Sequence, residues 1–121
     1  MELLPFIDVA TGGSGVAFPA TIEKAVSGIR GIDTVITGHM AAVQTWADFV
    51  EYGEFNREFL AAVEAAHQAG RTAQQAAAEL TLPPRFNGYV GDQRLPGLEF
   101  LGPGRIAGNV DVIYAELDDG T

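Results

Sequence analysis

Apolar residues recur at helical spacing shortly after Pro19. The positions i, i+3, i+4 and i+7 of this pattern are Ile22, Ala25, Val26 and Ile29. That spacing places the apolar side chains on one face of a helix. Proline is favoured in the first turn of a helix, and Gly31 follows the last apolar position. The pattern therefore predicts an amphipathic helix over residues 19–29, after a loop or extended segment over residues 1–18.

The longest helical pattern begins after Thr45 and extends to about Gln68. Thr45 is a favoured N-cap residue, and Asp48 three positions later gives a variant of the capping box. Gly53 lies inside the pattern at a cost of about 1 kcal/mol relative to Ala, so we expect close packing or a bend there. The apolar stripe of this helix is formed by Phe49, Tyr52, Phe59, Leu60, Val63 and Ala66. With Phe55, its aromatic side chains are expected to be core rather than a ligand pocket.

Two shorter helices follow in the sequence. Thr72 and Gln75 form a second capping box, which opens an Ala-rich helix that reaches Leu80 and is ended by the prolines of residues 83–84. A last helix is predicted over about residues 106–117, with residues 118–121 as a frayed tail. Its apolar positions are Ile106, Val110, Ile113, Tyr114 and Leu117.

Residues 83–105 are rich in Pro and Gly and also carry large apolar side chains. This composition predicts a long apolar loop rather than a polar linker. Loops of this length are uncommon unless they cover or bind something.

A β-branched run over residues 33–37 predicts a strand, and it is followed at once by Gly38-His39. α/β proteins place ligands and metals at the C-terminal ends of their strands, so His39 is a candidate functional residue. A lone strand cannot satisfy its backbone hydrogen-bonding groups. We therefore expect it to pair either with residues 3–9 or with another chain.

The composition limits the classes of partner. The chain has 121 residues, 47% of them apolar, no Cys, and a net charge of −9 from 16 acidic and 7 basic residues. Such a chain predicts one domain, and its acidity makes nucleic acids and anionic membranes poor partners. Without Cys there are no disulfides and no thiolate metal sites. The sequence shows no signal peptide and no membrane span, so the default expectation is a cytoplasmic location.

Residues 12–39 combine several features in one order. They are a Gly-Gly-Ser segment, a Pro-led helix containing Ile-Glu-Lys-Ala, an Ile-Asp pair, a β-branched strand and Gly38-His39. This order resembles the C-terminal part of metallo-β-lactamase-fold hydrolases, where a helix precedes a strand that ends in a Pro-Gly-His-Gly-like turn. Here the turn reads Thr37-Gly38-His39-Met40. The later helices, including Asn109 to Tyr114, also look like that part of the family, so the resemblance covers most of the chain.

The resemblance implies an α/β fold: a partial, half αββα metallo-β-lactamase-like sandwich, dominated by helices and with few strands. Residues 1–121 would form a single domain of this kind. In the family the last metal-ligand histidine lies in this turn, so His39 is implied as a metal ligand, and zinc is the cofactor implied for the full-length family.

The other metal ligands of the family are missing from this sequence. The first metal motif, His-x-His-x-Asp-His, does not occur, and neither do the middle His and the bridging Gly-Asp segment. A hydrolytic zinc site needs three protein ligands and an open position for water. We therefore expect no zinc in the isolated chain and little or no hydrolase activity from it, and the resemblance leaves the substrate open.

Simpler interpretations stand beside these. His39 alone is a hydrogen-bonded histidine at a strand end, and His67 is a surface histidine near a helix C-terminus, where the helix dipole favours it. The glycine segment around Ser14 has the spacing of neither a phosphate loop nor a dinucleotide fingerprint, and no nucleophile elbow surrounds Ser14 for a triad with His39. Trp46 either lines a pocket near His39 or staples the entry of the long helix.

The expected partner is a second copy or the missing N-terminal half. A half sandwich exposes the face that the other half would cover, and an unpaired strand edge invites pairing. A homodimer with two-fold symmetry would answer both problems. The alternative function is thus a non-catalytic homo-oligomeric interaction or small-ligand-binding module. A third possibility is that the chain is a fragment of a longer gene product.

Overall fold

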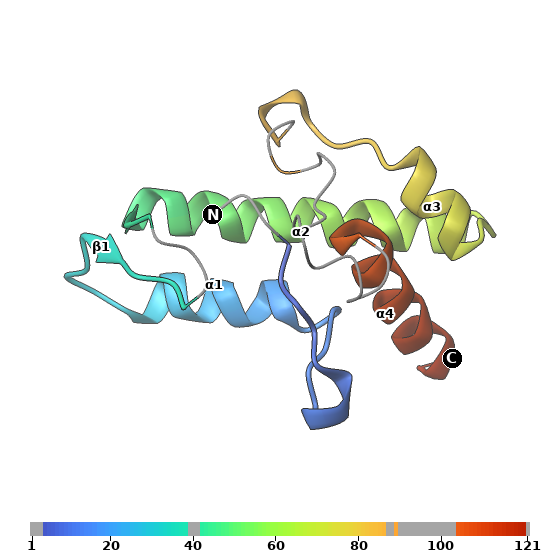
Figure 1. The fold of residues 1–121 in the computed structure, drawn as a ribbon, viewed down its shortest axis with the longest axis horizontal. Helices are drawn as coiled ribbons and strands as arrows, with labels where there is room; N and C mark the ends of the chain where they lie inside the picture. The colour runs from blue at the N-terminus through green and yellow to red at the C-terminus, as the bar shows by residue number, and fades with distance from the viewer. Residues whose placement is uncertain (1–3, 39–41, 87–88, 90–103, 121) are drawn as a thin grey trace.

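The computed structural model describes residues 4–38, 42–86, 89 and 104–120. Within these residues the fold is dominated by four α-helices and holds a two-stranded antiparallel sheet. The long helix α2 (Trp46–Gln68) is the central element, and α1, α3 and α4 all contact it. α1 (Phe18–Gly28) runs antiparallel along the first half of α2, while α3 (Ala73–Glu79) and α4 (Arg105–Asp119) lie against its second half (Figure 1).

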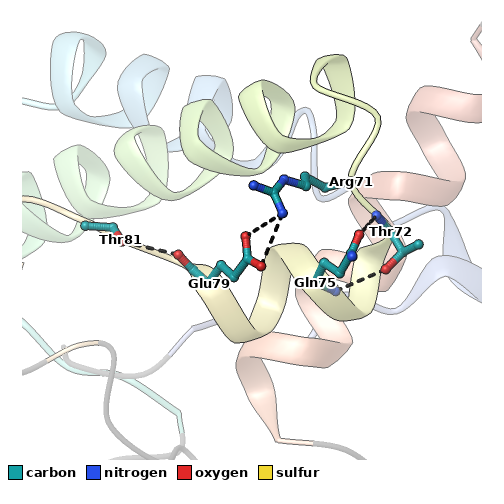
Figure 2. Close-up of polar contacts among 5 residues, drawn as sticks. All are labelled: Arg71, Thr72, Gln75, Glu79 and Thr81. Carbon is teal, nitrogen blue, oxygen red and sulfur yellow. Dashed lines mark hydrogen bonds and ion pairs between the residues drawn. The ribbon is translucent and has the colours of Figure 1, made fainter.

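Both predicted capping boxes are present. The Thr45 hydroxyl accepts a hydrogen bond from the Asp48 N–H at 3.1 Å, and the Asp48 carboxylate accepts one from the Thr45 N–H at 2.7 Å. The Thr45 hydroxyl also donates to this carboxylate at 2.8 Å. The two hydrogen bonds that the carboxylate accepts lower the pKa of Asp48 below its usual 3.8, because they favour its charged form. Thr72 and Gln75 make the same reciprocal pair at the start of α3, with distances of 3.2 and 3.0 Å (Figure 2).

An ion pair closes the short helix α3 back onto the turn before it. Arg71 lies 3.0 Å from Glu79, and the Thr81 hydroxyl donates to the Glu79 carbonyl (Figure 2). Both charged side chains are about half exposed, so the pair adds little energy by itself. Together with the capping box it fixes where this seven-residue helix begins and ends.

The core is built mainly on the apolar stripe of α2. The sequence prediction that its aromatic residues are core is confirmed for Tyr52, Phe55 and Phe59, which are buried. Phe49 is partly buried and packs against this core. Phe86 and Tyr89, from the segment predicted as an apolar loop, complete this core. The Tyr89 ring stacks on Phe55 with centroids 4.3 Å apart, and Phe86 meets Phe55 edge-on at 5.7 Å. The rest of that predicted loop, residues 87–88 and 90–103, lies outside the described residues.

The predicted pairing of the strand with residues 3–9 was wrong, whereas its pairing with another chain stays a prediction. The strand is only Thr34–Val35 (β1), and its partner is Gln44–Thr45 (β2), with Thr34 opposite Thr45. Residues 4–9 hold no strand; the described chain there is irregular and leads into the 3-10 turn Val9–Thr11. The pairing is local because the chain returns after a short connection, and the Trp46 N–H extends it by donating to the Asp33 carbonyl at 3.0 Å.

The last helix is longer than predicted at its C-terminal end. α4 continues to Asp119, so Asp118 and Asp119 are helical rather than a frayed tail. One contact of this last turn joins Asp118 to His67 at the end of α2, at 2.8 Å.

Candidate functional site

The segment that leads to the predicted metal ligand lies at one edge of the molecule. β1 is followed by Ile36, Thr37 and Gly38, and His39 itself lies outside the described residues. The Thr37 hydroxyl is buried and has no hydrogen-bond partner among the described residues. Trp46 begins α2 on the partner side of the sheet and packs on Phe49 of its own helix, with ring centroids 5.2 Å apart.

Exposed apolar side chains surround this edge. Ile36 is 81% exposed and Val43 is 65% exposed, next to β1 and β2 respectively. We call Ile29, Ile32, Ile36 and Val43 the β-ribbon patch. Exposed apolar side chains are candidates for surfaces that another chain covers, and a two-stranded ribbon leaves backbone groups on its outer edges available for further pairing.

The described residues do not bring together a set of metal ligands. No group of three or more His, Cys, Asp or Glu side chains lies close enough to hold a metal ion in the part of the chain that the structure describes. Of the sequence candidates, only the positions around His39 belong to the β1 edge, whereas His67 lies in the last turn of α2.

His67 is engaged in a contact between two helices. Its Nε2 lies 2.8 Å from Asp118 Oδ1, and its ring meets the Tyr114 ring edge-on at 4.9 Å. Burial, followed by the nearby Asp118 charge, raises the pKa of Tyr114. The Tyr114 hydroxyl is buried without a hydrogen-bond partner among the described residues. This arrangement joins α2 to α4.

The glycine segment before α1 binds a carboxylate of the chain itself. Glu116 of α4 accepts a hydrogen bond from the Ser14 hydroxyl at 2.5 Å and another from the Gly15 N–H at 2.6 Å. Ser14 in turn accepts a hydrogen bond from the Ala17 N–H at 2.9 Å, just before α1. We call Ser14, Gly15 and Glu116 the Glu116 clasp. Through the Ser14 hydroxyl and the Gly15 amide, the clasp joins the segment before α1 to α4.

Gly15 permits this contact by its small size. A Cβ at this position would lie 2.8 Å from Cγ1 of the buried Ile113. The sequence offered Ser14 as a candidate for anion binding or nucleophilic chemistry, and nothing in the sequence indicated Glu116 as its partner. Glu116 lies 102 positions after Ser14 and 101 positions after Gly15. No local sequence pattern connects residues so far apart, so only the three-dimensional structure identifies the partner.

A groove runs between α1 and α2. It has a volume of about 370 Å³, and its apolar lining includes Val16, Ile22, Val26, Val50 and Leu60. Three charged residues also line it: Glu23 from α1, and Glu54 and Arg57 from α2. Glu54 is paired with Arg85 at 2.8 Å. We call this surface the α1–α2 groove.

Comparisons with known proteins add no relative: no family model, no curated protein and no solved structure matches the chain. None of the described helices is long and apolar enough to cross a membrane.

Proposed function

We propose that this chain is the C-terminal portion of a metallo-β-lactamase-like hydrolase, contributing His39 as one metal ligand and having little or no catalytic activity alone. The observation that carries the proposal is the incomplete sheet at the β1 edge. A helix, a short strand and Gly38-His39 follow one another in the order of the family, and the strand has the β-ribbon patch around it. In a complete sandwich, further strands would cover this edge.

The zinc chemistry of the family needs ligands beyond those the described residues bring together. A catalytic zinc ion takes three protein ligands and one water, and the described residues hold no such cluster. His67 is turned to Asp118 instead. The proposal therefore assigns the remaining ligands to an N-terminal half of the His-x-His-x-Asp-His type, and no reaction step is assigned to this chain by itself.

The experiment begins with the coding sequence upstream of residue 1. We expect an in-frame segment that encodes His-x-His-x-Asp-His, and the longer protein should bind zinc stoichiometrically by elemental analysis. His39→Ala in that protein should reduce the bound zinc, while His67→Ala, the matched control, should leave it unchanged. A stop codon upstream with no such motif, or equal zinc in both variants, would contradict the proposal.

A second candidate function is self-association as a non-catalytic module. The α1–α2 groove favours it, because an open groove with an apolar floor between two helices is a surface on which further helices pack. Sedimentation equilibrium of the 121-residue chain tests this candidate directly. A dimer is expected, and a monomer at all concentrations would rule it out.

A further inference from the structure

The two charged groups on the walls of the α1–α2 groove stand on different helices. Glu23 belongs to α1 and Arg57 to α2, and both side chains are exposed. Among the described residues, neither side chain has a hydrogen-bond or ion-pair partner. The third charged group of the groove, Glu54, is already compensated by Arg85. The groove therefore offers one unpaired acid and one unpaired base on opposite walls.

The position of these two groups along the groove follows from the helix packing. α1 and α2 are antiparallel (Figure 1), and Ile22 packs on Gly53, where a Cβ would lie 2.9 Å from Ile22 Cγ2. Glu23 thus lies near the level of Gly53, and Arg57 lies about one helical turn further along α2. The two charges are offset along the groove as well as across it.

We propose that the α1–α2 groove is the interface of a homodimer in which Glu23 of each copy pairs with Arg57 of the other. A two-fold interface brings the same patch of both copies together, so it requires a surface that complements itself. A two-fold axis in the contact plane, midway between Glu23 and Arg57, places each acid on the base of the second copy. The four helices then form a bundle around the apolar side chains of both grooves.

Charge complementarity distinguishes a second copy from other occupants. An anionic helix would be opposed by Glu23 and a cationic one by Arg57, whereas a second copy pairs both groups at once. The pairing also specifies register, because a shift along the groove by one turn would separate both pairs. This inference rests on the second proposed function, self-association, and is independent of the hydrolase proposal.

Charge reversal gives a test with an internal rescue. In a dimer of Glu23→Arg, or in a dimer of Arg57→Glu, both ion pairs become pairs of like charge. Each variant should therefore dimerise at least about tenfold more weakly than the wild type, because two exposed ion pairs are lost and replaced by repulsion. An equimolar mixture of the two variants restores both attractive pairs and should form a heterodimer with near wild-type affinity. Sedimentation equilibrium measures each association.

Two control variants have matched charge. Asp111→Arg, on the exposed surface of α4, has the same net charge as Glu23→Arg, and Lys24→Glu has the same net charge as Arg57→Glu. Neither control residue lines the groove, so both variants should dimerise within about twofold of the wild type, and circular dichroism confirms that all four variants are folded. The rescue in the mixture also shows that both reversed chains are competent to associate.

The outcomes separate the two proposals. A wild-type monomer at all concentrations overturns both self-association and this interface. A wild-type dimer that tolerates both charge reversals, or a mixture that fails to recover affinity, overturns the interface and leaves self-association standing. Weak single variants with recovery in the mixture support the paired arrangement.

Discussion

Burial changes the acid–base chemistry of Tyr52. The side chain lies in the core beneath α1, with its ring edge-on to Phe18 at 6.4 Å. Burial raises the pKa of Tyr52 from 10.0 to about 12, although the Asn56 side chain and the Arg105 charge act in the opposite direction. The folded protein therefore favours the neutral phenol.

Tyr52 should consequently make stability depend on alkaline pH. Its contribution is fully present below pH 10, the pKa of the phenol in the unfolded chain, and is lost as pH rises through 10 toward 12, since only the unfolded state then gains the charged form. The loss should be roughly 2 kcal/mol. Urea unfolding of the wild type and of Tyr52→Phe between pH 9 and about 12 measures this loss. If the free energy of unfolding falls with pH about equally steeply in both proteins, the expectation is contradicted.

At the scale of the elements, Gly53 lets α1 pack closely on α2, where the side chain of a better helix former would overlap with Ile22. The sequence predicted close packing or a bend at this position, and the structure confirms close packing, because Ile22 of α1 occupies the space beside it. Ile22 is buried and β-branched, so its Cγ2 has little freedom to move away.

Gly53→Ala should therefore destabilise the protein. The substitution gains about 1 kcal/mol of helix propensity but forces an overlap at 2.9 Å, for which overpacking costs of about 1–3 kcal/mol are typical. The net expected change in the free energy of unfolding is a loss of up to about 2 kcal/mol. Urea unfolding measures this change.

Gly108→Ala is the matched control. This glycine lies inside α4, and an added Cβ would meet no atom of the described residues within 4 Å, so the variant should be stabilised by up to about 1 kcal/mol. An equal stabilisation of both variants would show that the Ile22 contact does not constrain α2.

Local patterns predicted the helices more successfully than the sheet. The two capping boxes could be found because their partners are three residues apart, and the helix boundaries follow from those boxes and from the prolines. The strand partner could not, because a two-residue pairing between Thr34–Val35 and Gln44–Thr45 leaves no alternating apolar pattern in the polar second strand. The resemblance to a larger family does not specify this pairing either.

At the scale of the whole molecule, the Glu116 clasp joins the segment before α1 to α4. It could not be predicted, because hydrogen bonds between residues over a hundred positions apart have no signature in local spacing. The candidate site at His39 shows the converse: its position after a strand was readable from the sequence, and the strand is present, but His39 lies outside the described residues.

Glu116→Ala should destabilise the contact between the segment before α1 and α4. The substitution removes the acceptor for the Ser14 hydroxyl and the Gly15 N–H, both part of a partly buried contact, and loss of such charged hydrogen bonds costs about 1–3 kcal/mol. Urea unfolding measures the loss, and hydrogen exchange should show a less protected Gly15 amide. Asp119→Ala, on the exposed end of the same helix, should leave both readouts near the wild type. Unchanged protection of Gly15 in Glu116→Ala would contradict the role of the carboxylate.

The Glu116 clasp also sets an order of events during synthesis on the ribosome. The Ser14 hydroxyl and the Gly15 amide emerge early, but their acceptor is made 102 and 101 residues later. Until α4 has left the exit tunnel, the nascent segment before α1 has no such anchor, and the helix pair α1–α2 must form without it. The attachment of that segment is therefore a late step, which follows the synthesis of α4 and of the core elements that precede it in the chain.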